Sequence, residues 1–177
     1  MRIIGGSLGG RVLRPSMKKW PTRPTTDIAK EALYNILAHK IDLEGIRCLD
    51  LFGGAGNHSL ELASRGAGHV TYVDQYHGCV KWMREVTTKL SLNQVRIVRS
   101  EVRKFLQQDM DKYDLIFADP PYALSWLSEL PGLILEKDRL IEGGILIIEH
   151  AFQTNLDHHD RYTDRRKYGQ SAFSFFR

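Results

Sequence analysis

The tetrapeptide Asp119-Pro120-Pro121-Tyr122 contains the residue types that can orient an amine. The exocyclic amine of a nucleobase is a poor nucleophile because its lone pair is delocalised into the ring. If the Asp119 carboxylate and the Pro120 carbonyl accept its two N–H bonds, the nitrogen moves toward tetrahedral geometry and its lone pair faces an electrophile. The prolines fix φ and remove backbone donors, so the turn is stiff. Tyr122 offers a flat face for a flipped-out base, an interaction worth about 1–3 kcal/mol.

The apolar residues 115–118 lead directly into this tetrapeptide. A continuous apolar run is typical of a strand that is buried on both faces of a parallel sheet. Ligands of such sheets bind at the carboxyl ends of the strands, which is where the tetrapeptide follows. An ordinary turn is the alternative, since Asp and Pro are common turn residues. The upstream sequence favours the functional interpretation.

A strand, a glycine turn and a helix are predicted upstream, over residues 46–52, 53–56 and 58–65. The turn reads Gly53-Gly54-Ala55-Gly56, and its glycines allow a ligand to approach the backbone beside a helix N-terminus. The next predicted strand, residues 70–73, ends at Asp74. An acidic residue in this place can accept both hydroxyls of a ribose. Together these features predict a nucleotide-type cofactor site, although a lone glycine turn often binds nothing.

An NAD-dependent dehydrogenase also combines a glycine turn with an acidic residue after the second strand. Its G-x-G-x-x-G/A fingerprint reads here Gly54-Ala55-Gly56-Asn57-His58-Ser59 and fails at the last position. Asp50, before the glycines, favours a methyltransferase turn, where it would hold the amine of the methionine part of S-adenosylmethionine through backbone and water contacts. The tetrapeptide at 119–122 decides for the methyltransferase.

With these motifs, the chain resembles the family of bacterial small-subunit ribosomal RNA guanine-N2 methyltransferases. The segments that carry the resemblance run nearly from end to end: Met1-Arg2-Ile3-Ile4-Gly5-Gly6, Arg23-Pro24-Thr25-Thr26-Asp27, Leu49-Asp50-Leu51-Phe52-Gly53-Gly54-Ala55-Gly56, Arg65-Gly66-Ala67, Phe117-Ala118-Asp119-Pro120-Pro121-Tyr122, Ile148-Glu149-His150 and Tyr168-Gly169. The chain departs from the family in lacking the serine of the glycine turn, in Asn57-His58 after that turn, and in Glu101 where Asp is usual.

The resemblance implies an α/β, Rossmann-like class I methyltransferase. We expect a seven-stranded, mostly parallel sheet with an antiparallel C-terminal hairpin and a short basic N-terminal extension. One methyltransferase domain is expected over residues 1–177, with a basic arm at 1–24 and an S-adenosylmethionine-binding catalytic core at 25–177. The implied reaction is methylation of the exocyclic N2 of a guanine in small-subunit ribosomal RNA.

The site residues predicted on this basis fall into two groups. The catalytic residues are Asp119, Pro120, Pro121 and Tyr122. The residues expected to bind S-adenosylmethionine are Asp50, Phe52, Gly53, Gly54, Gly56, Asp74, Glu101, Val102 and Asp119.

Basic residues are concentrated near the N-terminus, although the whole chain has a formal charge of only +4. Residues 1–40 contain eight basic and two acidic residues, a formal +6, which is the charge pattern expected for binding a polyanion. The predicted RNA-binding residues are Arg2, Arg11, Arg14, Lys18, Lys19, Arg23 and His150. A solvated basic arm is the alternative for the cluster, and a histidine satisfied by local hydrogen bonds is the alternative for His150.

The remaining elements are predicted from periodicity. Residues 1–24 hold many Gly and Pro residues and should form irregular or short-hairpin structure. Helices are expected at 27–39, 80–90 and 126–135, strands at 95–98 and 145–148, and a hairpin over 161–177 that turns at Tyr168-Gly169. Trp82, Met83 and Trp126 are expected to be core or covering residues.

Composition and cysteine usage favour an intracellular enzyme. With 177 residues and no apolar run of about 18 residues, we expect a soluble, cytoplasmic protein, a monomer. Cys48 and Cys79 imply packing rather than disulfides. Asp157-His158-His159-Asp160 is a poor chelate because neighbouring residues of an extended chain point opposite ways, so we expect no metal.

The expected partner is ribosomal RNA or the assembling small ribosomal subunit. A DNA adenine-N6 or cytosine-N4 methyltransferase shares the tetrapeptide, but this chain has little room for a separate target-recognition region. A catalytically silent RNA-binding factor is the other alternative.

Overall fold

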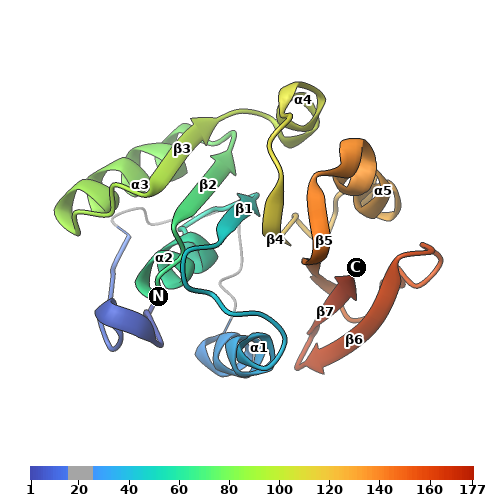
Figure 1. Cartoon of the computed structure of the whole chain (residues 1–177), viewed down its shortest axis with the longest axis horizontal. Helices are drawn as coiled ribbons and strands as arrows, with labels where there is room; N and C mark the ends of the chain where they lie inside the picture. The colour runs from blue at the N-terminus through green and yellow to red at the C-terminus, as the bar shows by residue number, and fades with distance from the viewer. Residues whose placement is uncertain (16–25) are drawn as a thin grey trace.

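The computed structural model describes residues 1–15 and 26–177. Its strands are β1 (Arg47–Leu51), β2 (His69–Asp74), β3 (Val95–Arg99), β4 (Tyr113–Ala118), β5 (Leu140–Ala151), β6 (Tyr162–Tyr168) and β7 (Ser171–Phe176). Within the described residues they form one seven-stranded sheet in the order β3-β2-β1-β4-β5-β7-β6, shown in Figure 1. The pairs from β3 to β5 are parallel, and β7 is antiparallel to both β5 and β6. The predicted sheet and its C-terminal hairpin are confirmed.

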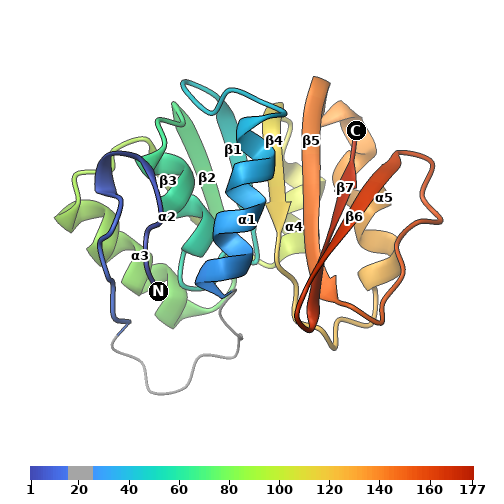
Figure 2. The same cartoon turned by 90° about the horizontal axis from the view of Figure 1, so that it is seen from below.

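Helices cover both faces of the sheet. The α-helices are α1 (Asp27–Ala38), α2 (Asn57–Ser64), α3 (His77–Lys89), α4 (Val102–Gln108) and α5 (Leu130–Leu135), and the short 3-10 helices are η1 (Gly6–Leu8), η2 (Leu127–Glu129) and η3 (Glu136–Asp138). Buried side chains of α1, α2 and α3 share one apolar cluster with the sheet, and those of α4 and α5 share the other. Figure 2 shows α1 in front of the middle of the sheet, running alongside β1 and β4.

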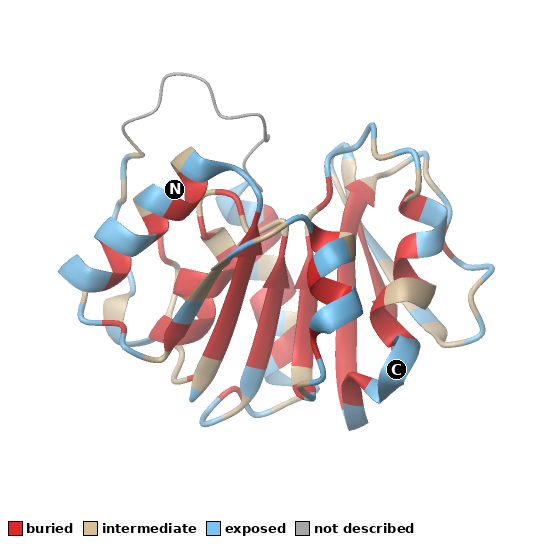
Figure 3. Ribbon diagram, turned by 90° about the horizontal axis from the view of Figure 1, so that it is seen from above, coloured by how far each residue is buried: buried red, intermediate tan, exposed pale blue. Residues whose placement is uncertain are grey.

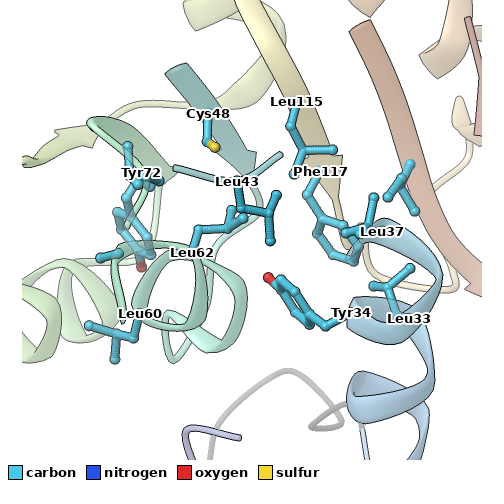
Figure 4. Packing of buried hydrophobic residues seen from close by; sticks show 14 of the residues in the cluster. Leu33, Tyr34, Leu37, Leu43, Cys48, Leu60, Leu62, Tyr72, Leu115 and Phe117 are labelled. Atoms are coloured by element: carbon cyan, nitrogen blue, oxygen red, sulfur yellow. The ribbon is translucent and has the colours of Figure 1, made fainter. Parts of the chain in front are cut away.

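The strands alternate between these two clusters, as their pleat requires. Cys48 of β1 and Phe117 of β4 point into the first cluster, whereas Leu49 and Ile116 point into the second. Figure 3 shows the central strands as an almost continuous buried layer. Figure 4 shows Tyr34 and Leu37 of α1 against Phe117. A sheet buried on both faces explains why its strands read as continuous apolar runs.

Two predicted elements have different bounds in the structure. The helix expected at 126–135 is divided into η2 and α5, because Pro131 stands in the first turn of α5, where its missing N–H costs no hydrogen bond. The strand expected at 145–148 extends over all of β5, with a register shift opposite β4 between Tyr113 and Leu115. The hairpin turns beside Gly169, at φ 63°, as predicted.

The first residues of the chain are attached to α2 through one buried carboxylate. Glu61 accepts hydrogen bonds from the backbone N–H groups of Ile4 and Gly5 at 2.7 and 2.8 Å. It also pairs with Lys30 of α1 at 3.2 Å, and neither side chain of this pair is exposed. Lys30 in turn donates to the carbonyl of Arg2. The predicted irregular segment is therefore held in place over residues 1–15, while residues 16–25 lie outside the described part of the chain.

We expect Glu61→Gln to destabilise the fold, because it leaves the buried Lys30 ammonium without its counter-charge. Removing one partner of a buried ion pair costs about 3–5 kcal/mol of unfolding free energy. Glu85→Gln is the matched control, since its pair with Lys81 spans 4.0 Å between exposed side chains and should contribute about 0–1 kcal/mol. Urea denaturation of both variants measures the difference. Equal midpoints for the two variants would contradict this account of Glu61.

Candidate active site

A cavity of about 730 Å³ opens at the carboxyl ends of the parallel strands. Its walls come from the segments that follow β1, β2, β3 and β4: Phe52, Asp74, Gln75, Tyr76, His77, Cys79, Arg99, Glu101, Val102, Pro121, Leu124 and Trp126. The volume lies within the range of small-molecule and cofactor sites, about 300–1,000 Å³. Sequence segments far apart in the chain meet here because parallel strands end at the same edge of a sheet.

The glycine turn follows Phe52, which lines the cavity, and is tied to β2; Gly53, Gly54 and Gly56 are not themselves among the lining residues. The Gly53 N–H donates to the Val73 carbonyl at 3.0 Å, and the Gly54 N–H donates to an Asp74 carboxylate oxygen at 2.9 Å. The Tyr72 hydroxyl donates to the Gly54 carbonyl at 2.7 Å. Phe52, at φ 59°, starts the turn with a backbone conformation that is uncommon outside glycine.

Two glycines of the turn are required by close neighbours. A Cβ on Gly53 would lie 2.3 Å from the Tyr72 ring, and one on Gly56 would lie 2.0 Å from the Met83 sulfur. Gly56 also has φ 79° as the N-cap of α2. The turn thus fits the space between β2 and α3 only without side chains at these positions, which leaves its backbone close to the cavity.

Asp74 stands on the cavity wall, where a ribose acceptor was predicted. One carboxylate oxygen accepts from Gly54, and the other accepts from the Tyr76 N–H at 2.7 Å. Burial raises the pKa of this carboxyl above its ordinary value, while these N–H donors lower it. Each carboxylate oxygen has a second lone pair, so Asp74 keeps acceptor capacity for a ligand hydroxyl.

Asp50 lies beneath the turn and is 1% exposed. Its Oδ2 accepts from the Ser59 N–H at 3.0 Å and from the Ser59 hydroxyl at 2.5 Å, which ties β1 to the first turn of α2. Burial raises the pKa of Asp50 to about 7, against the opposing effect of the Ser59 donors. Asp50 is absent from the residues that line the cavity, so the structure gives it a role in supporting the turn.

Glu101 and Val102 line the far end of the cavity at the start of α4. Glu101 is the N-cap of this helix, and its carboxylate accepts from the backbone N–H groups of Arg103 and Lys104 at 3.0 and 2.9 Å. Val102 is 3% exposed and packs in the second cluster. The longer side chain at position 101 is thus accommodated by a helix cap.

The aromatic part of the wall was only partly anticipated from the sequence. Trp126 was expected to be a core or covering residue, and its ring lies 6.1 Å from that of Phe52 on the cavity wall. The Arg103 guanidinium stacks on the Trp126 ring, 4.3 Å from the ring centroid. Tyr76, two residues after Asp74, was not predicted at all, although its position directly after a strand end was an available signal.

Asp119 stands at the carboxyl end of β4 and is half-buried. Its N–H donates to the Leu51 carbonyl at 3.2 Å, which extends the pairing of β4 with β1 by one residue. Burial raises the pKa of Asp119 well above its ordinary value, and the nearby carboxylates of Glu149 and then Asp50 raise it further. The carboxyl groups of three strands are thus gathered at one edge of the sheet.

The rest of the tetrapeptide separates two cavities. Pro121 lines the large cavity, whereas Tyr122 lines a second one of about 350 Å³. The Pro121 carbonyl accepts from the Leu124 N–H at 2.9 Å, which closes the turn. Tyr122 is 40% exposed, and its hydroxyl lies 2.5 Å from the Ser171 hydroxyl on the hairpin. The two cavities therefore lie on either side of this turn.

The predicted RNA-binding residues are placed unequally. Arg2, Arg11 and Arg14 are exposed, while Lys18, Lys19 and Arg23 lie outside the described residues. His150 is corrected: it is fully buried, with one ring nitrogen 2.8 Å from the Ser174 hydroxyl and the other 2.9 Å from the Ala151 carbonyl. Its ring contacts a hydroxyl of the neighbouring strand β7 and the carbonyl of the next residue, so the alternative of a locally satisfied histidine applies.

His58, one of the departures from the family pattern, is part of the apolar packing between α1 and β4. Its buried ring stacks on Phe117 with centroids 3.5 Å apart, and its Nδ1 lies 3.3 Å from the Tyr34 hydroxyl. Among residues 1–15 and 26–177, no group of three or more His, Cys, Asp or Glu side chains is arranged to hold a metal ion. None of the helices in the same ranges has the length and apolar character needed to cross a membrane.

Comparisons with known proteins agree with this geometry. The family model described as Conserved hypothetical protein 95 matches residues 1–177. The chain is 34% identical to the putative rRNA methyltransferase YlbH of Bacillus subtilis over 88% of this chain and 85% of that protein. It is 31% identical to ribosomal RNA small subunit methyltransferase D of Escherichia coli K12 over 88% and 77% of the two chains.

A solved structure titled as the putative methyltransferase yhhF from Escherichia coli superposes with a TM-score of 0.86 and 28% identity, over 99% of this chain and 96% of that one. The match therefore extends over the sheet, the glycine turn and the tetrapeptide together. Because the family model matches the entire chain, the protein belongs to the Conserved hypothetical protein 95 family, whose named relatives here are methyltransferases.

Proposed function

We propose that this protein transfers a methyl group from S-adenosylmethionine to the exocyclic N2 of a guanine in small-subunit ribosomal RNA. The observation that carries the proposal is the position of the tetrapeptide between two cavities, with Pro121 on the larger and Tyr122 on the smaller. The relatives named as ribosomal RNA methyltransferases support the substrate class. The choice of N2 of guanine follows the family resemblance.

The residues of the larger cavity fit S-adenosylmethionine. Asp74 has acceptor capacity for ribose hydroxyls, and the glycine turn brings backbone groups close to the cavity. Phe52 and Trp126 provide apolar faces, and Glu101 and Val102 close the end next to β3. The cofactor supplies a methyl group on a positively charged sulfur, and the carboxylates at this edge of the sheet favour a cation by their charge.

Asp119 and the Pro120 carbonyl orient the amine in the proposed reaction. Both accept N–H bonds, so the nitrogen lone pair turns toward the larger cavity, and the transfer needs no general base before the bond forms. As the new N–C bond forms, the sulfur keeps the electron pair of its broken bond to the methyl group, and the methylated nitrogen then releases one N–H proton to solvent. Holding two reacting groups in line contributes about 7–11 kcal/mol to lowering a barrier. Tyr122 is exposed enough to stack on a base that enters the smaller cavity.

Basic side chains suited to RNA phosphates lie in two separate regions of the surface. Arg2, Arg11 and Arg14 are exposed near the N-terminus, and Arg11 and Arg14 lie beside Lys89 of α3. Strand β6 adds Arg165, Arg166 and Lys167 next to the turn that borders the smaller cavity. These groups fit phosphates by charge. The single domain, the monomeric state and the cytoplasmic location stay predictions.

The direct test is transfer of radiolabelled methyl from S-adenosylmethionine to small-subunit particles and to naked ribosomal RNA, both lacking the modification, followed by nucleoside analysis. We expect N2-methylguanosine. Methylated adenine or cytosine in DNA would instead support the DNA-methyltransferase alternative. RNA binding without any transfer would support the silent RNA-binding factor.

We expect Asp119→Ala to lower kcat by about 100-fold or more, a loss typical of deleting one preorganised electrostatic contact. Asp119→Asn keeps one acceptor oxygen and should retain more activity. In the wild type, protonation of Asp119 removes an acceptor, and its raised pKa means that this happens at a higher pH than for an ordinary Asp. The rate should therefore fall as the pH is lowered through this pKa and level off above it.

The pH–rate profiles of wild type and Asp119→Asn isolate this effect, because the two proteins share every other titrating group. The acid limb that belongs to Asp119 should be missing from the variant. Identical profiles would show that Asp119 does not need to be ionised for the reaction.

Gly53→Ala should weaken S-adenosylmethionine binding by about tenfold or more, a loss of about 1.4 kcal/mol. The new Cβ would lie 2.3 Å from the Tyr72 ring and would displace the turn from β2. Gly132→Ala is the matched control, since the nearest atom to its Cβ is 4.0 Å away. Titration calorimetry with S-adenosylmethionine measures both affinities. Unchanged binding by the Gly53 variant would mean that the turn does not contact the cofactor.

A further inference from the structure

Glu149 occupies a position next to Asp119 that the reaction described above does not use. In the parallel pairing of β4 with β5, Ala118 stands opposite Ile148. The next residues along the two strands are Asp119 and Glu149, and the pleat turns them to the opposite face from Ala118 and Ile148, the face covered by α1. Adjacent strands lie about 4.8 Å apart, so two carboxylates are side by side at this edge.

The smaller cavity lies against this second carboxylate. It is lined by Thr26, Ile28, Ala29, Tyr122, Glu149, Tyr168, Gly169, Gln170 and Ser171. Glu149 is 3% exposed and is the only ionisable acidic or basic side chain among these described lining residues, apart from the tyrosines. A carboxylate set into the wall of an otherwise uncharged cavity, beside an aromatic ring, is suited to orient a flat polar ligand.

The hydrogen-bonding edge of guanine matches two adjacent acceptors. Guanine carries an N1–H donor directly beside its N2 amine, whereas adenine and cytosine have a ring-nitrogen acceptor beside their exocyclic amine. An ionised carboxylate accepts hydrogen bonds and donates none. It therefore attracts the guanine edge and repels the lone pair that adenine or cytosine would present in the same place.

We propose that Glu149 accepts the N1–H of the target guanine while Asp119 accepts an N–H of its N2 amine, so that Glu149 is the residue that selects guanine. The proposal rests on the proposed function and adds to it the residue that reads the base. Glu149 contacts the base at a position next to the reacting amine, so it acts in specificity and orientation. The guanine preference is then assigned to one side chain of this site.

A base analogue tests the contact on the wild-type protein. The RNA position that the protein methylates is synthesised with either guanine or 2-aminopurine, and the RNA is presented in the form that the wild type accepts. 2-Aminopurine keeps the N2 amine but has an acceptor at N1. We expect kcat/KM for 2-aminopurine to be lower by about 10- to 100-fold, the range for losing one hydrogen bond to a charged group.

2-Aminopurine also lacks the O6 atom of guanine, which could itself lower the rate. The variant Glu149→Gln separates the effect of the N1 contact from the effect of the missing O6. The glutamine amide can donate to the N1 of 2-aminopurine, so the preference for guanine should fall by about tenfold or more in the variant. Glu142→Gln is the matched control, because Glu142 is an exposed residue of the same strand outside the cavity and should keep the wild-type preference. Affinity for S-adenosylmethionine should be unchanged in both variants.

The outcomes distinguish a failure of the inference on Glu149 from a failure of the proposed function. If the wild type methylates guanine but Glu149→Gln keeps the same preference, the inference on Glu149 is overturned and the proposed function stands. Equal use of guanine and 2-aminopurine by the wild type would also overturn the inference, whether or not the variant folds. If the wild type methylates no RNA, or methylates adenine or cytosine, the proposed function and the inference both fail.

Discussion

The parallel registers of β1 with β2 and β4, and of β4 with β5, are the constraint on which the site depends. These registers align the carboxyl-terminal parts of four strands at one edge of the sheet. They therefore bring four carboxylates near one another: Asp50, Asp74, Asp119 and Glu149. Carboxylates gathered in a partly buried place repel one another and lose hydration. The pKa values of Asp50, Asp74 and Asp119 are all raised, with burial as the first cause.

Backbone and hydroxyl donors offset part of this electrostatic cost. Ser59 satisfies Asp50, and the N–H groups of Gly54 and Tyr76 satisfy Asp74. These same bonds hold the glycine turn and the start of α2 against the sheet. The donors that stabilise the buried carboxylates therefore also hold the segments around the cavity in place. The pKa of Asp119 stays raised by burial and by Glu149. A ligand that donates hydrogen bonds to the Asp119 carboxylate would lower this pKa.

The stiff turn after β4 divides this edge of the molecule into two sides. Its prolines restrict the backbone, and the bond from Leu124 to the Pro121 carbonyl closes it. On one side, aromatic and apolar side chains share the walls with Asp74, Arg99 and Glu101. On the other side, Tyr122 and Glu149 line a cavity together with the hairpin turn. The bond between Tyr122 and Ser171 attaches this second side to the hairpin, so the antiparallel end of the sheet contributes to the site.

The sequence alone determined the elements and the residues that act through local structure. The apolar run before Asp119, the glycine turn and the acidic end of β2 each carry their signal within a few neighbouring residues, because strand burial and turn geometry are local requirements. Bounds were less well determined where one proline divided a helix, at Pro131, or where pairing extended a strand, at β5.

Only the tertiary structure decided which side chains meet. The burial of His150, the support of Asp50 by Ser59, the clamp of Glu61 on Ile4 and Gly5, and the place of Trp126 on the cavity wall join residues that are distant in sequence or on opposite faces of a strand. The adjacency of Asp119 and Glu149, 30 positions apart, follows from the register of β4 with β5. Register is set by packing of whole strands and helices, which no short segment of sequence encodes.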